Sequence, residues 1–267
     1  MSKRLWWLLA VCFALPCVML LLAAMTGQDG HRVNLDAVLA TASMQHLLGC
    51  DDLGRDVLSR LAEGLQLSIF VGFVVVVLGG TIGIAIGVFA AWSGGWIDGL
   101  LMRIADIVLS FPGILLAIAM AAMLGPSIEN LVLALVVVGW VGFARLSRVQ
   151  VLSLKSSPFI EAALANGMGV VYITIKHLLP NIAAPLLVEA SFGLAAVMIG
   201  EAGLSFLGVG VQAPDASLGT MIREGTRLML VSPSLVIWPG LMLFSIVMAV
   251  NLLGDALRDH LDVKRTS

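Results

Sequence analysis

The sequence predicts an all-α protein that crosses a membrane six times. Of its 267 residues, 60% are hydrophobic and only 12% are charged, whereas an ordinary soluble domain carries about 25% charged residues. A helix needs roughly 20 apolar residues to cross the hydrocarbon core of a bilayer. Six runs reach or approach that length, at residues 6–25, 67–92, 101–124, 130–149, 183–207 and 234–254. We therefore expect a polytopic bundle of six transmembrane helices.

The first apolar run follows Lys3 and Arg4, which is also how a secretory signal peptide begins. Its apolar stretch is too long for a usual signal core, and no clean A-x-A cleavage pattern follows it. These features favour a retained first span. The AAMTG stretch leaves a cleavable signal as the alternative.

The distribution of Lys and Arg predicts the orientation, because cytoplasmic loops are enriched in these residues. With the N-terminus inside, five of the 15 cations are external, at Arg32, Arg55, Arg60, Arg223 and Arg227. The other ten are cytoplasmic, at Lys3, Arg4, Arg103, Arg145, Arg148, Lys155, Lys176, Arg258, Lys264 and Arg265. Both termini are therefore expected in the cytoplasm. The net charge of −2 gives no indication of nucleic-acid binding.

We divide the chain into residues 1–66, which hold the first span and an external segment, a five-helix core at 67–260, and a cytoplasmic tail at 261–267. The external segment ends in LLGCDDLGRDVLSRLAEG, where acidic and basic residues alternate at spacings of three to five. On a helix this spacing places opposite charges on neighbouring turns. The pattern favours an amphipathic segment at the membrane surface.

A stripe of small residues runs along the second span, at Gly79, Gly83, Gly87 and Ala91. Membrane helices approach closely where small residues recur every four positions. We expect this span to be buried among the others.

The sequence of the third span, RIADIVLSFPGILLAI, contains two opposite charges and a Pro-Gly pair. Arg103 and Asp106 lie three residues apart and are expected to pair. Pro112 followed by Gly113 is expected to bend the span. Asp106 is either part of such a structural ion pair or a functional group, since ionisable residues within membrane segments are functional candidates.

Residues 156–182, between the fourth and fifth spans, have the pattern of two short helices joined by a hinge. Ser157 is expected to cap the first helix, with Pro158 and Glu161 in its first turn and Gly167 at its end. The second helix is expected to run through VVYITIKHLL and to stop at Pro180. The first helix presents Ala162, Ala163 and Ala165 as a flat surface, which suits docking into a groove of a cytoplasmic partner.

These residues resemble a known family. Glu161-Ala162-Ala163, Gly167 and the ending Ile175, Leu179, Pro180 resemble the EAA loop of ABC importer permeases. The stretches LGCDDLGRDVLSRL, ADIVLSFPGILLAI, EAGLSFLGVG and NLLGDALRDHLD narrow the resemblance to the C-type subunits of dipeptide, oligopeptide and nickel importers. The motifs cover nearly the whole chain from about residue 46. Departures include Cys50, where the family usually has Thr, and Glu189, which is unusual in the fifth span.

The resemblance implies a MetI-like type I ABC importer permease core in the bacterial inner membrane. It implies four kinds of neighbour: a second permease subunit, two ATP-binding ATPase subunits, an extracytoplasmic solute-binding protein, and membrane lipid. The EAA residues named above would couple this chain to an ATPase subunit. No lysine follows a glycine, so the phosphate loop G-x-x-x-x-G-K-[ST] is absent and ATP is expected on the partner subunits alone. We therefore expect a transporter subunit that is not an enzyme and holds no cofactor or metal.

The substrate pathway has three candidate residues. Glu189, Glu201 and Asp106 are candidates for it, because they are ionisable groups in membrane segments. Each of the two glutamates has the alternative of pairing with a cation on the second permease subunit. The same motifs serve peptide and nickel or metal-chelate importers, so the substrate class stays open. The rival function is a stand-alone secondary transporter or channel, although the sequence shows no internal repeat.

Overall fold

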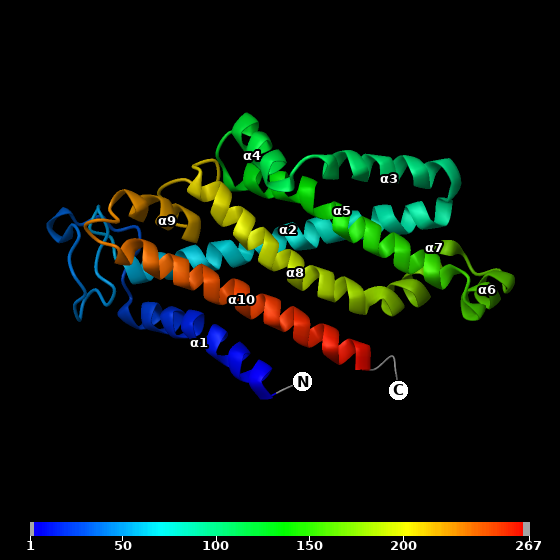
Figure 1. Ribbon diagram of the computed structural model, residues 1–267, viewed down its shortest axis with the longest axis horizontal. Helices are drawn as coiled ribbons and strands as arrows, with labels where there is room; N and C mark the ends of the chain where they lie inside the picture. Colours follow the sequence, from blue (N-terminus) through cyan, green and yellow to red (C-terminus); the bar gives the residue numbers. More distant parts are fainter. Residues whose placement is uncertain (1–2, 264–267) are drawn as a thin grey trace.

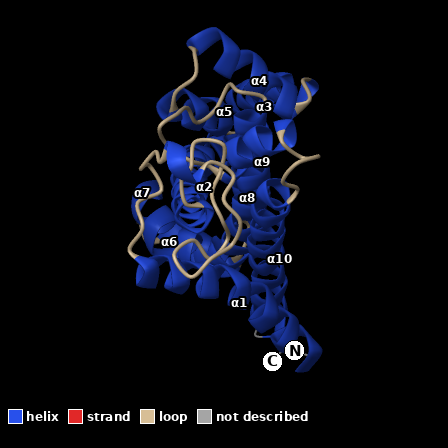
Figure 2. Ribbon diagram, turned by 90° about the vertical axis from the view of Figure 1, so that its left-hand side faces the viewer, coloured by secondary structure: helices blue, strands red, loops and turns tan. Residues whose placement is uncertain are grey.

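The computed structural model describes residues 3–263, and no strand occurs in that range (Figures 1 and 2). The described chain has ten α-helices and two other helical turns, and the longest connection, residues 27–56, lies between α1 and α2. The first half of the order is α1 (Lys3–Thr26), η1 (Leu35–Ala37), α2 (Val57–Ser93), α3 (Gly95–Ser110), α4 (Gly113–Leu124) and α5 (Ile128–Lys155). It continues with α6 (Pro158–Ala165), α7 (Val170–Ile173), η2 (Thr174–Leu178), α8 (Leu179–Phe206), α9 (Leu218–Arg227) and α10 (Ser234–Val263).

The number of spans agrees with the predicted six when one broken span is counted. Five helical segments are long and apolar enough to cross a bilayer alone. Helices α3 and α4 meet that test together, bent by 84° at the break between them. Phe111 is extended at the break, as expected for a residue that precedes a proline, and α4 starts directly after Pro112. The predicted bend is confirmed.

Helix α2 starts at Val57, well before the predicted start of the second span at residue 67. Asp56 caps it, because its carboxylate accepts hydrogen bonds of 2.8 Å from both the backbone N–H and the hydroxyl of Ser59. The interpretation of residues 51–60 as an amphipathic surface segment is wrong. Asp51, Arg55 and Arg60 are buried, and residues 57–66 extend the same helix that crosses the membrane.

Helices α2 and α5 pack backbone to backbone along the predicted stripe of small residues. A Cβ added at Gly83 would lie 2.3 Å from the carbonyl oxygen of Trp140, and one added at Gly87 would lie 2.2 Å from that of Ala144. Only glycine allows this approach. The stripe therefore fixes the central helix pair of the bundle, as its spacing predicted.

The helix that was expected to stop at Pro180 continues through it. Residues Val170–Phe206 form one helical segment, in which α7 and α8 are joined by the π-helical turn η2. In that turn the backbone N–H of Leu179 bonds to the carbonyl of Thr174, five residues back. Pro180 has no N–H to donate, and it falls in the first turn of α8, directly after the wider turn. The prediction of a separate short helix is wrong for that reason.

The two ends of the bundle differ in character (Figure 1). Helices α6 and α7 lie at one end of the long axis, and α9 lies at the other, beside the segment between α1 and α2. Figure 2 looks onto this second end, where loops lie across the helix ends. Helix α1 begins and α10 ends toward the end that carries α6 (Figure 1).

Candidate functional site

Helix α6 is the core of the predicted docking segment. Ile160 and Ala163 point into the protein and are buried in one apolar cluster with Ala91 of α2, Val151 of α5 and Ile173 of α7. Ala163 was expected on the exposed docking surface, and that expectation is wrong. The short helix needs an apolar anchor, and the i, i+3 pair Ile160 and Ala163 provides it.

The end of α6 is a Schellman motif. Gly167 has φ +77°, its N–H donates to the carbonyl of Leu164 at 2.9 Å, and the N–H of Met168 donates to that of Ala163 at 3.1 Å. The predicted glycine stop is confirmed. At the start of α6, Pro158 occupies the first turn as expected, whereas the Ser157 hydroxyl donates to the carbonyl of Leu154 instead of capping the helix.

The outward side of α6 is available to a partner. Glu161, Ala162 and Ala165 are exposed, and the Glu161 carboxylate forms no hydrogen bond or ion pair with the side chains that the structure describes. Of the remaining predicted coupling residues, Ile175 is 61% exposed and Pro180 is exposed, while Leu179 packs against the apolar cluster under α6. The predicted residues therefore divide into an exposed set and a set that anchors the segment.

Three residues that the sequence did not single out tie this segment to the bundle. The indole Nε1 of Trp92, at the end of α2, donates a hydrogen bond of 3.0 Å to the hydroxyl of Thr174 in the π turn. Lys155, at the end of α5, donates to the carbonyls of Ala91 at 3.2 Å and Trp92 at 3.4 Å. Its ammonium also lies 5.1 Å from the centre of the Trp92 ring. A lysine in the last turn of a helix was the only sequence signal for this anchor.

Asp106 has a different partner from the one predicted. It bonds to Arg145 of α5, and Asp98, nearer the start of α3, accepts two hydrogen bonds from Arg148. The expected pair with Arg103 is wrong, because α3 lies along α5 and brings the arginines of that helix within reach. Asp106 therefore joins two helices of this chain.

Glu201 is fully buried where α2 and α8 meet. Its carboxylate accepts hydrogen bonds from the hydroxyls of Ser68 at 2.6 Å and Ser205 at 2.8 Å. The Ser205 hydroxyl oxygen in turn accepts a bond from the backbone N–H of Val211, in the loop that leads to α9. In this structure Glu201 joins α2, α8 and that loop.

A network of four charges, three of them buried, lies at the end of the bundle opposite α6. Asp51 accepts hydrogen bonds from Arg55 Nε at 2.7 Å and Arg60 Nη1 at 2.6 Å, and Arg60 also donates to Glu224 of α9 at 2.9 Å. Arg55 donates to the same Glu224 oxygen at 3.4 Å. The network holds the external segment, α2 and α9 together. Local spacing gave no signal for the part played by Glu224.

Cys50 lies beside this network and is also buried. Burial and the neighbouring carboxylates of Asp56 and Asp51 raise the pKa of its thiol above the ordinary value. The thiol is therefore held in its neutral form.

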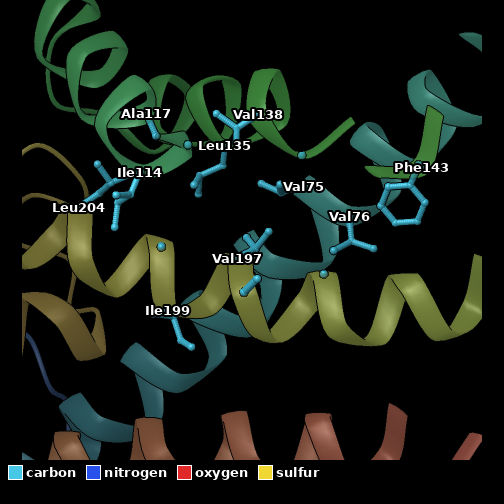
Figure 3. Close-up of a pocket in the computed structure, with 15 residues that line it drawn as sticks. Val75, Val76, Ile114, Ala117, Leu135, Val138, Phe143, Val197, Ile199 and Leu204 are labelled. Atoms are coloured by element: carbon cyan, nitrogen blue, oxygen red, sulfur yellow. The ribbon is translucent and has the colours of Figure 1, made fainter. Parts of the chain in front are cut away.

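Two cavities lie among the membrane helices. The first, of about 270 Å³, is lined by apolar side chains and glycines of α2, α4, α5 and α8, including Val75, Leu135 and Val197 (Figure 3). No ionisable side chain reaches it. The second, of about 450 Å³, lies among α5, α8 and α10 and contains Glu189 and Arg258. Glu189 is thus the one predicted pathway residue that lines a cavity.

The comparisons with known proteins agree with this arrangement. Residues 83–267 match the family model described as binding-protein-dependent transport system inner membrane component. The dipeptide transport permease DppC of Alkalihalophilus pseudofirmus is 40% identical over 91% of this chain and 80% of its own length. The nickel transport permease NikC of Escherichia coli K12 is 39% identical over 91% of this chain and 90% of its own. The glutathione transport permease GsiD of E. coli O6:K15:H31 is 42% identical over 83% of this chain and 73% of its own.

The fold is also that of a solved transporter. An inward-facing crystal structure of the MetNI methionine ABC transporter matches with a TM-score of 0.61 and 21% identity, over 75% of this chain and 95% of that one. This likeness confirms the predicted MetI-like fold, and the family match selects an ABC permease over a stand-alone transporter or channel. The chain belongs to the family of binding-protein-dependent inner membrane components and is a permease subunit of an ABC importer.

Proposed function

We propose that this chain forms a heterodimer with a second permease subunit and imports peptides or nickel in free or chelated form. The substrate classes come from the relatives, which are named for dipeptide, glutathione and nickel transport. Two ATPase subunits hold the ATP, and a solute-binding protein delivers the substrate at the outer face. This chain supplies the membrane path and the coupling contact and performs no catalysis.

The observation that carries the coupling role is the construction of α6. Its inner side is fixed to the bundle by Ile160 and Ala163, and its outer side leaves Glu161 and Ala162 free for a partner. The Schellman motif at Gly167 fixes its end. An anchored helix with an unoccupied outer face is what a groove on an ATPase subunit requires.

The helix from Val170 to Phe206 gives a route from this contact into the membrane. It starts in the docking segment, passes through the π turn and contacts α2, α5 and α10. A displacement of α6 would therefore act on a membrane helix through the four connecting residues 166–169. ATP-driven closure of the ATPase pair would then favour one of two arrangements of the bundle, which is what coupling between distant sites requires.

This proposal places the docking segment 156–182 and both termini in the cytoplasm. Helix α1 begins and α10 ends toward the end of the bundle that carries α6, which supports this orientation (Figure 1). The proposal retains the external segment within residues 1–66, the core at 67–260 and the tail at 261–267.

The test compares two glycines of like backbone geometry at opposite ends of the bundle. Gly167 has φ +77° and Gly27 has φ +59°, and a Cβ added at either would meet no atom within 4 Å. In cells that lack the gene, Gly167→Asp is expected to insert at normal levels and to abolish uptake of labelled dipeptide or nickel. Gly27→Asp, which carries similar strain away from the ATPases, is expected to support uptake. Normal uptake with Gly167→Asp at wild-type membrane levels would discard the docking role.

A further inference from the structure

The cavity among α5, α8 and α10 has the size and position of a ligand site. Its volume of about 450 Å³ falls within the range of pockets that hold small molecules. Helices α8 and α10 touch at Ser191 and Gly254, where a Cβ added to the glycine would lie 3.1 Å from the serine hydroxyl. The cavity lies on the α6 side of this contact. Apart from its two charges, its wall is formed mainly by Leu146, Pro185, Val188 and Phe192.

The two charged groups in this cavity have no side-chain partner among residues 8–261. Among the side chains of residues 8–261, neither the Glu189 carboxylate nor the Arg258 guanidinium has a hydrogen-bond or ion-pair partner, and the two do not pair with each other. By contrast, Asp98, Asp106 and Glu201 all have partners. Arg258 is exposed near the end of α10, whereas Glu189 is half-buried within a membrane helix. An unpaired charge within a membrane segment is costly, so a positive group from outside the chain would stabilise Glu189.

The wall beside Glu189 leaves room for this carboxylate. A Cβ added at Gly142 of α5 would lie 2.6 Å from Glu189 Oε1. Any larger residue at position 142 would displace the carboxylate from its present place. Gly142 therefore sets the position of the negative charge without contributing a charge of its own.

We propose that Glu189 and Arg258 form a binding site for a solute that carries a positive and a negative group, such as the free ammonium and carboxylate of a short peptide. The inference rests on the proposed import function and names the substrate class within it. The ammonium would pair with Glu189 and the carboxylate with Arg258, each as a charge-assisted hydrogen bond. Both unpaired charges would be neutralised by one ligand.

The same cavity is poorly suited to a bare metal ion. Arg258 places a positive charge in the cavity with Glu189, and a divalent ion would be repelled by it. Among the described residues, no group of three or more His, Cys, Asp or Glu side chains could hold a metal. Of the substrate classes suggested by the relatives, the cavity therefore favours zwitterionic peptides over free nickel.

The test measures occupation of the cavity directly. Leu146→Cys places a thiol on the cavity wall, in a chain whose Cys12, Cys17 and Cys50 are replaced by serine. The complete importer, assembled with its partner subunits in lipid vesicles, is treated with a small maleimide with and without alanyl-alanine. We expect the dipeptide to slow alkylation at least fivefold. The neutral N-acetyl-alanyl-alanine amide should give no protection.

Charge variants identify the residues that bind. Glu189→Gln and Arg258→Gln should each weaken protection by alanyl-alanine about tenfold or more, as expected for loss of a hydrogen bond to a charged group. Gly142→Ala should weaken it with both charges retained. Glu129→Gln and Arg103→Gln are matched controls, because neither residue lines the cavity, and both should leave protection unchanged.

Three results would overturn the site. They are equal alkylation with and without the dipeptide, slow alkylation that depends only on phosphatidylethanolamine in the vesicles, and dissociation of the permease pair by either Gln variant. Slow alkylation caused by the lipid alone would mean that a lipid headgroup occupies the cavity. Dissociation of the pair would mean that the second permease subunit supplies the partner of these charges. ATP-driven uptake by the Leu146→Cys importer is measured in parallel. Normal uptake without protection rejects this site alone, whereas loss of ATP dependence in the wild type rejects the proposed function.

Discussion

The indole of Trp92 and the hydroxyl of Thr174 are joined by a hydrogen bond of 3.0 Å between the end of α2 and the π turn η2. Trp92 is the penultimate residue of the longest helix, and Thr174 belongs to the segment that continues from the docking helix into the membrane. The bond is therefore a direct link between the coupling segment and a second membrane helix. Lys155 strengthens this link through its contacts with the last carbonyls of α2.

Trp92→Phe should loosen the coupling of ATP hydrolysis to uptake. The phenyl ring keeps an aromatic face for Lys155 but lacks the N–H that Thr174 accepts. Loss of one hydrogen bond costs about 1 kcal/mol, which changes the balance of two states about fivefold. We expect uptake per ATP hydrolysed to fall severalfold in the reconstituted importer. Trp96→Phe is the control, because Trp96 is 76% exposed on α3, and an equal loss in both variants would contradict the role of the bond.

Gly167→Ala should weaken ATPase docking through backbone conformation alone. An added Cβ at this position meets no atom, so the cost is that of holding alanine at φ +77°, about 1 kcal/mol or somewhat more. Binding of the permease to its ATPases, measured by titration in detergent, should weaken about fivefold or more. Gly169→Ala is the control, since Gly169 has φ −68° and equally open surroundings. Indistinguishable affinities for the two variants would show that the helix end does not require glycine.

Asp51→Asn should destabilise the external end of the protein. The substitution removes the countercharge of Arg55 and Arg60 in a buried network, where loss of one partner costs about 3–5 kcal/mol. Limited proteolysis should cut residues 27–56 faster, and thermal unfolding should begin at a lower temperature. Asp52→Asn is the control, because Asp52 is half-exposed and its nearest oxygen lies 3.8 Å from Arg55, too far for a hydrogen bond. Equal protease resistance in both variants would contradict a stabilising network.

Stability should fall at alkaline pH through Cys50. Burial and the carboxylates of Asp56 and Asp51 raise the pKa of this thiol in the folded protein above its unfolded value. The folded state therefore retains a proton that the unfolded state loses, and stability decreases as pH rises above the unfolded pKa. The slope is at most about 1.4 kcal/mol per pH unit. Unfolding midpoints measured from pH 8 to 10 should fall more steeply in the wild type than in Cys50→Ala, and parallel curves would contradict the assignment.

The features that the sequence predicted correctly are those with local causes. Gly167 ends α6 because its positive φ is a property of that residue, and Gly83 and Gly87 mark the α2–α5 contact because their spacing repeats along one helix face. Pro112 bends the third span through its own geometry. Each of these signals lies within a few residues of its effect.

The missed features depend on pairings across long distances in the chain. Glu224 meets Arg60 across 164 positions, and Arg145 meets Asp106 across 39, so neither pair has a spacing that the sequence could reveal. The expectation that a helix stops at Pro180 failed for a different reason. A proline usually ends a helix, but here the π turn before it removes the need for its missing N–H.

Helix α2 has 37 residues, which gives a length of about 56 Å against a hydrocarbon core of about 30 Å. It therefore spans the distance from the four-charge network at Arg60 to the Trp92 bond at the other end. A rod of this length that pivots inside the bilayer moves its two tips in opposite directions, and a tilt of only about 5° separates them laterally by about 5 Å. A small mechanical input on the ATPase side would thus reach the far face as a movement of opposite sense.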